Sequence, residues 1–145
     1  MSLNFLFQLS LQVQHLPAGH NVALVFTRCI LNNADYTPIG FSNPCNTTWT
    51  HQLAAAYAIT SPLITMAENP AMLLEDERLK PVLPFIKTLP SVWDETIVLP
   101  GSSIGETAVL ARRNGEDWYL VILNGEQSRD VEVNLDFLPL GRWKC

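Results

Sequence analysis

Charged side chains are nearly absent from the first half of this chain. Residues 1–67 contain only Arg28 and Asp35, whereas residues 68–145 carry 8 of the 9 Lys and Arg residues and 13 of the 14 Asp and Glu residues. A separate soluble domain usually carries charge at about a quarter of its residues. So little charge is typical of core segments whose covering layers are encoded elsewhere. The sequence therefore predicts a piece of a larger protein.

Further absences exclude whole classes of function. The net charge is −5 and no basic stripe is present, which excludes nucleic acid as a partner, because phosphate binding requires clustered cations. No apolar run is long enough to span a bilayer, so we expect no membrane partner. Three cysteines (Cys29, Cys45 and Cys145) and three histidines lack metal-ligand spacing. We therefore expect no metal site and no cofactor in this chain.

The opening residues 1–13, MSLNFLFQLSLQV, are apolar but have neither the basic start nor the cleavage site of a signal peptide. They fit a tag-plus-truncation start, or a strand or helix that belongs in a larger core, better than a signal-peptide remnant.

Residues up to about position 90 show alternating strand and helix signals. The short apolar runs Val22–Phe26 and Leu63–Met66 are typical of strands buried on both faces. Helices are predicted over His51–Thr60, with Thr50 as the N-cap, and over Ala71–Leu79 and Val82–Thr88. This order indicates α/β units with parallel strands.

After Pro90 the pattern becomes all-β. Asn-Gly turns separate short runs of strand-forming residues, and Val131, Val133 and Leu135 alternate with polar residues. The predicted strands are Thr96–Leu99, Glu106–Arg113, Asp117–Leu123, Asp130–Leu135 and Arg142–Lys144. We therefore predict an α+β chain with a domain boundary near residue 90, and with an antiparallel β-sandwich-like part over 91–145.

Several segments, in this order and spacing over about residues 20–145, resemble glycoside hydrolase family 97. They are Phe26-Thr27-Arg28, Asp35-Tyr36-Thr37-Pro38, Thr50-His51-Gln52-Leu53-Ala54, Ser61-Pro62-Leu63, Phe85-Ile86, Leu89-Pro90-Ser91-Val92-Trp93-Asp94-Glu95-Thr96, Ile104-Gly105-Glu106, Ala111-Arg112-Arg113 and Trp118-Tyr119. The resemblance implies an enzyme with an N-terminal β-sandwich, a central (β/α)8 barrel and a C-terminal β-sandwich. Such enzymes hydrolyse α-linked glucosides or galactosides and depend on calcium.

The resemblance makes residues 1–90 an incomplete barrel remnant of about two βα units and residues 91–145 part of the C-terminal sandwich. It places the general acid, the base or nucleophile and the calcium-binding glutamates on segments N-terminal to this chain. Glycoside hydrolysis needs two carboxyl groups, and Asp35 and Glu68 are the only candidates near strand ends. Because the resemblance places the catalytic and calcium-binding residues on earlier segments, we predict no catalytic residue and no calcium site in this chain.

Arg28, Asp35 and Tyr36 are the candidate substrate-binding residues, because they follow a predicted strand at the barrel rim. The competing interpretation is an internal ion pair between Arg28 and Asp35 with Tyr36 packed on it. For Trp93 we expect burial at a domain interface rather than a sugar-stacking role.

Two functions stay open at this point. The first is an inactive C-terminal part of an α-glycoside hydrolase, whose parent binds an oligosaccharide and whose open barrel edges drive self-association. The alternative is a non-catalytic carbohydrate-binding or protein-interaction β-sandwich module. The resemblance implies a bacterial periplasmic or secreted parent, and the chain itself carries no signal for a compartment.

Overall fold

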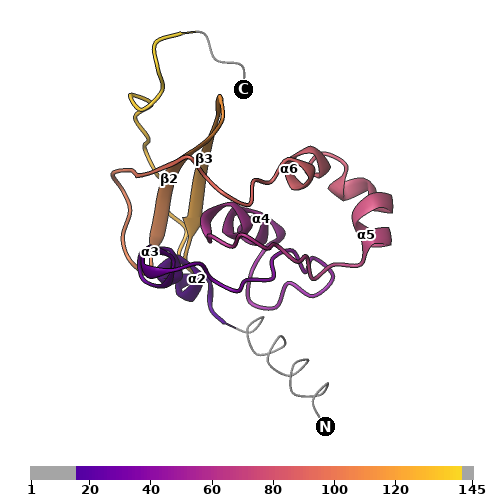
Figure 1. Cartoon of the computed structure of the whole chain (residues 1–145). Coiled ribbons are helices and arrows are strands. Elements are labelled where there is room, and N and C mark those ends of the chain that lie inside the picture. Colours follow the sequence, from indigo (N-terminus) through magenta and orange to yellow (C-terminus); the bar gives the residue numbers. More distant parts are fainter. Residues whose placement is uncertain (1–15, 142–145) are drawn as a thin grey trace.

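The computed structural model describes residues 16–141, so two predictions, for residues 1–13 and for a strand at Arg142–Lys144, lie outside the described residues. Its framework is an antiparallel sheet of β1 (Glu95–Val98), β2 (Thr107–Asn114) and β3 (Asp117–Asn124), in the order β1-β2-β3. Figure 1 shows helices gathered on one side of this sheet. The three strands confirm the first three strand predictions after residue 90 to within one or two residues.

A two-residue turn sets the register of the β2–β3 hairpin. Asn114 pairs with Asp117, and the pairing continues to Thr107 opposite Asn124. Gly115 in this turn has a φ of 61°, a left-handed conformation that glycine adopts without steric cost. The Asn-Gly signal in the sequence thus corresponds to the hairpin turn.

The helices are α2 (Ala18–Phe26), α3 (Arg28–Leu31), α4 (Trp49–Ala58), α5 (Pro70–Glu75), the 3₁₀-helix η1 (Glu77–Leu79) and α6 (Leu83–Lys87). The three predicted helices are confirmed as α4, α5 with η1, and α6. The N-cap of α4 is Thr48, whose side chain accepts a hydrogen bond from His51 N, rather than the predicted Thr50. No helix among residues 16–141 is both long and apolar enough to cross a membrane.

The strand prediction for Val22–Phe26 is wrong, because this run lies in α2. Ala18, Asn21, Val22 and Val25 are buried at the spacing of one helix face, and a short apolar run does not distinguish a strand from a buried helix. Leu63–Met66 also lies outside any strand. Residues 16–94 therefore contain no parallel strand, and the barrel remnant stays a prediction.

The helical layer and the sheet share a core. Ala108, Leu110, Val121 and Leu123 form the inner face of the sheet and pack with Val22 and Val25 of α2 and with the buried residues of α4. The predicted domain division near residue 90 stays a prediction, and residues from both sides of it contribute to this cluster.

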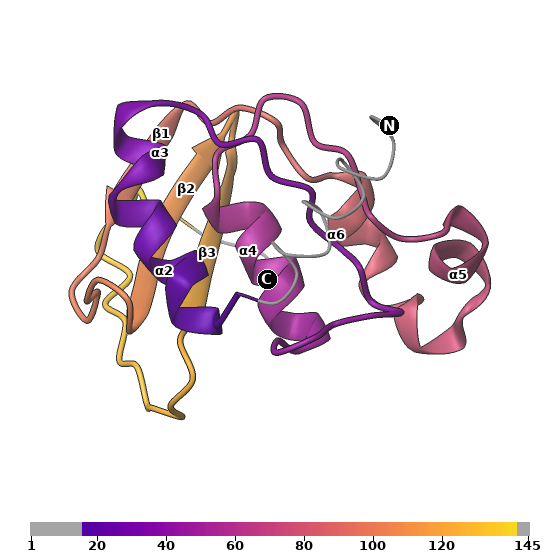
Figure 2. The same ribbon diagram turned by 90° about the horizontal axis from the view of Figure 1, so that it is seen from below.

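Two further clusters complete the packing. On the outer face of the sheet, Val109 and Ala111 are covered by Val131, Val133 and Phe137. Residues 130–135 form no ladder, so the strand prediction there is wrong, although Val131 and Val133 do pack on the outer face of the sheet. Beyond α4, the helices α5, η1 and α6 surround a separate cluster, and Figure 2 shows them on the side away from the sheet.

Candidate functional site

The three residues predicted to bind substrate follow α2 but do not form one cluster of paired groups. Arg28 is exposed at the start of α3, and Asp35 is exposed in the following loop. The salt bridges of the described residues do not include an Arg28–Asp35 pair. Tyr36 is half-buried against the core under the sheet, and burial raises its pKa to about 12. Tyr36 is therefore neutral and partly packed on the core, while the two charged side chains face solvent.

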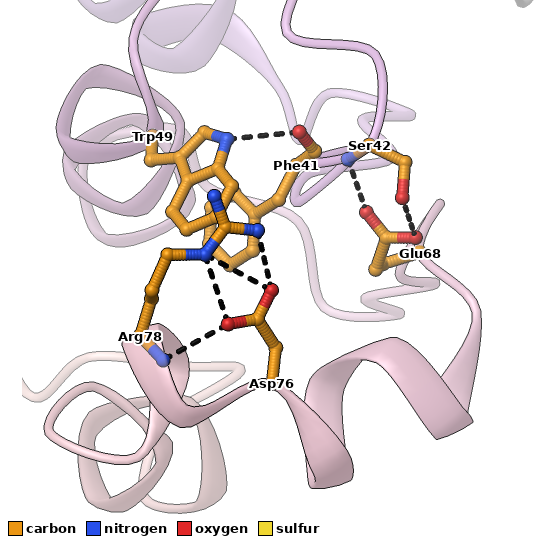
Figure 3. A network of polar contacts seen from close by, with 6 residues as sticks. All are labelled: Phe41, Ser42, Trp49, Glu68, Asp76 and Arg78. Atoms are coloured by element: carbon orange, nitrogen blue, oxygen red, sulfur yellow. Dashed lines mark hydrogen bonds and ion pairs between the residues drawn. The ribbon is translucent and has the colours of Figure 1, made fainter.

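Glu68 is the centre of a polar network that fixes the loop before α4. Its carboxylate accepts hydrogen bonds from Ser42 N (2.5 Å), Ser42 Oγ (2.7 Å) and Asn69 N (2.9 Å), as Figure 3 shows for Ser42. Burial alone would raise the pKa of Glu68, but these hydrogen bonds outweigh burial and lower it. A catalytic general acid requires the opposite shift, so Glu68 is suited to anchoring the loop as an anion.

A second network, also in Figure 3, joins the start of α4 to η1. Asp76 caps η1 through Arg78 N (2.9 Å) and forms a salt bridge with the Arg78 side chain, and these hydrogen bonds lower the pKa of Asp76 to about 2. The Arg78 guanidinium lies 4.7 Å from the ring centroid of Trp49, whose indole N–H donates to Phe41 O (2.8 Å). The contact between Arg78 and Trp49 joins residues that lie far apart in the sequence, so no local sequence pattern indicates it.

His51 links α2, α4 and the end of β3. Its Nδ1 lies 3.1 Å from the carbonyl oxygen of Asn124, which can only accept, so Nδ1 carries the proton. Nε2 then accepts from Asn21 Nδ2 at 3.1 Å. Burial lowers the pKa of His51, which keeps the ring neutral. Both ring nitrogens are satisfied, so the geometry is that of a structural residue.

Arg112 is a buried cation, and its individual role was not predicted from the sequence. Only 3% of it is exposed, yet it lies on the inner face of the sheet, where its Nη1 donates to Tyr57 O at 2.8 Å. The guanidinium lies 5.2 Å from the ring centroid of Trp93, and burial lowers the pKa of Arg112 to about 10. Arg112 therefore joins the end of α4 to the sheet. Its position in the predicted β-strand did not indicate this role.

The tryptophans of the described residues are engaged in packing. Trp93 contacts Tyr57 and Tyr119, with centroid separations of 6.0 and 5.3 Å, as an interface residue would. Trp118 packs on Phe137 at 5.4 Å on the outer face. These rings do not line up as an exposed platform for a sugar ring.

The placement of the remaining acidic and metal-ligating side chains bears on metal binding by residues 16–141. Within this part of the chain, no group of three or more His, Cys, Asp or Glu side chains is placed to hold a metal ion. Glu68, one of the two candidate carboxylates, is fully engaged by neighbouring donors. Glu68 is therefore held as a hydrogen-bond acceptor within the fold.

Comparisons with known proteins point to the C-terminal segments of α-glycoside hydrolases. A retaining alpha-galactosidase of Bacteroides thetaiotaomicron is 32% identical over 132 residues, which are 82% of this chain and 19% of that protein. A probable retaining alpha-galactosidase of Streptomyces bingchenggensis is 32% identical over 130 residues, covering 87% and 20% of the two chains. The chain therefore spans about a fifth of the length of the curated relatives it matches.

Solved structures and a family model indicate more specifically which family of glycoside hydrolases this chain resembles. A glycoside hydrolase family 97 enzyme from Pseudoalteromonas, in complex with acarbose, has a TM-score of 0.70 and 34% identity, covering 86% of this chain and 21% of that chain. A beta-arabinopyranosidase has a TM-score of 0.57 and 27% identity, covering 74% and 18%. Residues 92–145 match the family model described as glycosyl-hydrolase 97 C-terminal, oligomerisation. Together these findings support glycoside hydrolase family 97 as the family of this chain.

Proposed function

We propose that this chain is the C-terminal, non-catalytic part of an α-glycoside hydrolase and that it serves self-association. The observation that carries the proposal is the match of residues 92–145, which include β1, β2 and β3, to an oligomerisation domain. The parent enzyme would hydrolyse α-galactosides or α-glucosides, as the names of the relatives suggest, with retention of configuration.

The catalytic carboxylates and the calcium site of the parent would lie outside this chain. A glycosidase needs a protonated acid and a second carboxylate at a defined separation. Glu68 has a lowered pKa and three hydrogen-bond donors, so it is poorly suited to donate a proton or to bind calcium. Asp35 alone would supply a single carboxylate.

The uncovered part of the outer sheet face is the surface that we assign to self-association. Leu120 and Ile122 of β3 lie on this face beside the residues covered by Phe137, yet they are 45% and 38% exposed. Burying such side chains against a second copy is favourable by about 25 cal/mol per Å² of apolar surface. The competing surface is the helical part, where self-association through open barrel edges was predicted and where Leu31 is 88% exposed.

Light scattering on two charge variants tests this assignment. We expect Leu120→Lys to lower the mass of the assembly at a given concentration, because it places a cation in the proposed contact. Leu31→Lys is the matched control, since it introduces the same charge at an exposed apolar residue of the helical layer. A loss of mass for Leu31→Lys alone would move the contact to the barrel-edge surface.

Arg28, Asp35 and Tyr36 stay the proposed contribution of this chain to substrate binding in the parent. Arg28 and Asp35 face solvent, which is compatible with contact to a sugar hydroxyl. Amide NMR shifts of residues 28–36 on addition of an α-galactoside would support the proposal, and unchanged shifts at saturating sugar would contradict it. The alternative function was a carbohydrate-binding or protein-interaction module, and the packed positions of Trp93 and Trp118 disfavour its carbohydrate-binding form.

A further inference from the structure

The loop after α3 and the loop after α4 run side by side in the same direction. Ala34 N donates to Thr60 O (2.9 Å), and Ala67 N donates to Pro38 O (3.0 Å). Residue numbers rise together along the two loops, so the loops are parallel, and Figure 2 shows both of them leading toward α5. Two hydrogen bonds do not make a ladder, but they hold the two loops together.

Exposure alternates along the loop after α3 with the period of a β-strand. Asn33, Asp35 and Thr37 are exposed, whereas Ala34 and Tyr36 are partly packed on the core. Successive side chains of a strand point to opposite sides, so these two groups lie on opposite sides of the loop.

The loop after α4 shows the same alternation. Leu63, Thr65 and Ala67 are exposed, whereas Ile64 and Met66 are partly buried. Each of the two loops therefore has one covered side and one uncovered side.

The covered side of both loops faces α4, the helix that connects them. Ala34 and Tyr36 pack in the cluster that contains most of the buried residues of α4, and Met66 packs in the cluster that contains Ala56 of the same helix. The exposed side chains of both loops therefore lie together, on the side away from α4. We call this surface the loop face, and it consists of Asn33, Asp35, Thr37, Leu63, Thr65 and Ala67.

The hydrogen bonds also place the two threonines of the loop face beside each other. In a parallel pair, the C=O of a residue accepts from the N–H one position after the residue that lies beside it. Because Pro38 O accepts from Ala67 N, Met66 lies beside Pro38, and Thr65 lies beside Thr37. Asp35 is on the same side, two residues or about 7 Å before Thr37.

The threonines lie near the carboxyl ends of the parallel segments. Ser42, farther along the loop after α3, donates its hydroxyl to the carboxylate of Glu68 (2.7 Å), which follows the second segment. The chain thus continues from both segments to the same place, as parallel segments require. In proteins with parallel strands joined by helices, ligands bind at this end of the strands.

The chemistry of the loop face favours an uncharged ligand that is rich in hydroxyl groups. Four of its six residues are polar, and burying them against apolar protein without hydrogen bonds would be unfavourable. Threonine hydroxyls can donate and accept, and the Asp35 carboxylate accepts. No residue of the loop face is a cation, so an anionic ligand would meet only the negative charge of Asp35. A neutral sugar supplies the matching donors and acceptors.

We propose that Asp35, Thr37 and Thr65 form a binding site for one ring of a neutral α-linked sugar. The Asp35 carboxylate accepts from a sugar hydroxyl, and the two threonine hydroxyls bind neighbouring oxygens of the ring. This role rests on the proposed function, because the site would hold part of the substrate of the parent enzyme. It adds Thr37 and Thr65 to the candidate residues, whereas Tyr36 lies on the side of α4.

NMR titration of the full chain with methyl α-galactoside tests this proposal. We expect the methyl signals of Thr37 and Thr65 to shift together with the Asp35 amide and to give one dissociation constant. Thr37→Val keeps the shape of the side chain without its hydroxyl and should raise this constant about fivefold, and Asp35→Asn should raise it about tenfold or more. Thr96→Val is the matched control and should leave it unchanged, because Thr96 is an exposed strand threonine of β1.

The absence of shifts at Thr37 and Thr65 would overturn the proposal, and so would equal shifts with glycerol or a dissociation constant that both variants leave unchanged. Shifts confined to Arg28 and Tyr36 would also overturn it, but would keep a substrate role for the chain. Light scattering on the same samples reports self-association separately, so an assembly without sugar binding would contradict this site and not the proposed function. If Thr37→Val loses the dispersed amide spectrum of the folded chain, Thr65→Val is compared with Thr96→Val by the same criteria.

Discussion

Replacing Arg112 tests how the helical layer is attached to the sheet. Arg112→Ala removes a charge-assisted hydrogen bond to Tyr57 O, worth about 2 kcal/mol, and a cation–π contact with Trp93, worth about 1 kcal/mol. It also removes the buried aliphatic stem, which contributes about 2 kcal/mol. These losses act together because all three contacts lie in the same buried site.

An opposing effect reduces the expected loss. Burial lowers the pKa of Arg112 from 12.5 to about 10, which corresponds to about 3 kcal/mol against keeping the guanidinium charged inside the protein. Removing the charge recovers this cost but leaves the Tyr57 carbonyl without its donor, a penalty of about 1 kcal/mol or more. We therefore expect Arg112→Ala to lower the free energy of unfolding by about 3 kcal/mol, and Arg112→Met, which keeps the stem, by about 1 kcal/mol.

Urea unfolding, followed by tryptophan fluorescence, measures these differences. Arg113→Ala is the matched control in the same strand, because Arg113 forms solvent-accessible ion pairs with Asp94 and Glu95 and its loss should cost about 1 kcal/mol at most. Equal losses for Arg112→Ala and Arg113→Ala would refute the role of Arg112 as the link between α4 and the sheet.

Three smaller perturbations follow from local geometry. Thr48→Ala should destabilise by about 1 kcal/mol in thermal unfolding because it removes the N-cap, whereas Thr50→Ala, inside the helix, should have little effect; equal losses would contradict the observed cap. Gly115→Ala should cost about 1 kcal/mol at its φ of 61°, with no clash, and an unchanged melting temperature would contradict this. Glu68 has a lowered pKa in the folded state, so its contribution to stability is present above its unfolded-state pKa and is lost as the pH falls through the folded-state value. Glu68→Gln should therefore flatten the acid side of the melting temperature against pH, and an unchanged slope would exclude this role.

The sequence was sufficient where local chemistry dominates. The Asn114-Gly115 turn between two runs of β-branched and aromatic residues predicted the β2–β3 hairpin, and alanine-rich sequence predicted α4. Both signals concern residues that are neighbours in the chain, so no knowledge of tertiary contacts was needed.

The failures have one physical cause, which is dependence on partners distant in sequence. Val22–Phe26 is helical because Val22 and Val25 pack on the inner face of the sheet, and their β-branched side chains alone favour a strand. Glu68 and Arg112 owe their roles to donors and acceptors 26 and 55 residues away. A single sequence contains no local pattern for such contacts.

The central claim is that this chain is a self-associating, non-catalytic part of an α-glycosidase, and one combined measurement tests it directly. Light scattering gives the mass of the full chain while hydrolysis of nitrophenyl α-galactoside and α-glucoside is followed with calcium present. The account predicts an assembly larger than one copy and no turnover above that of a buffer blank. A monomer with calcium-dependent turnover would contradict it, and Asp35 and Glu68 would then be the carboxylates to replace.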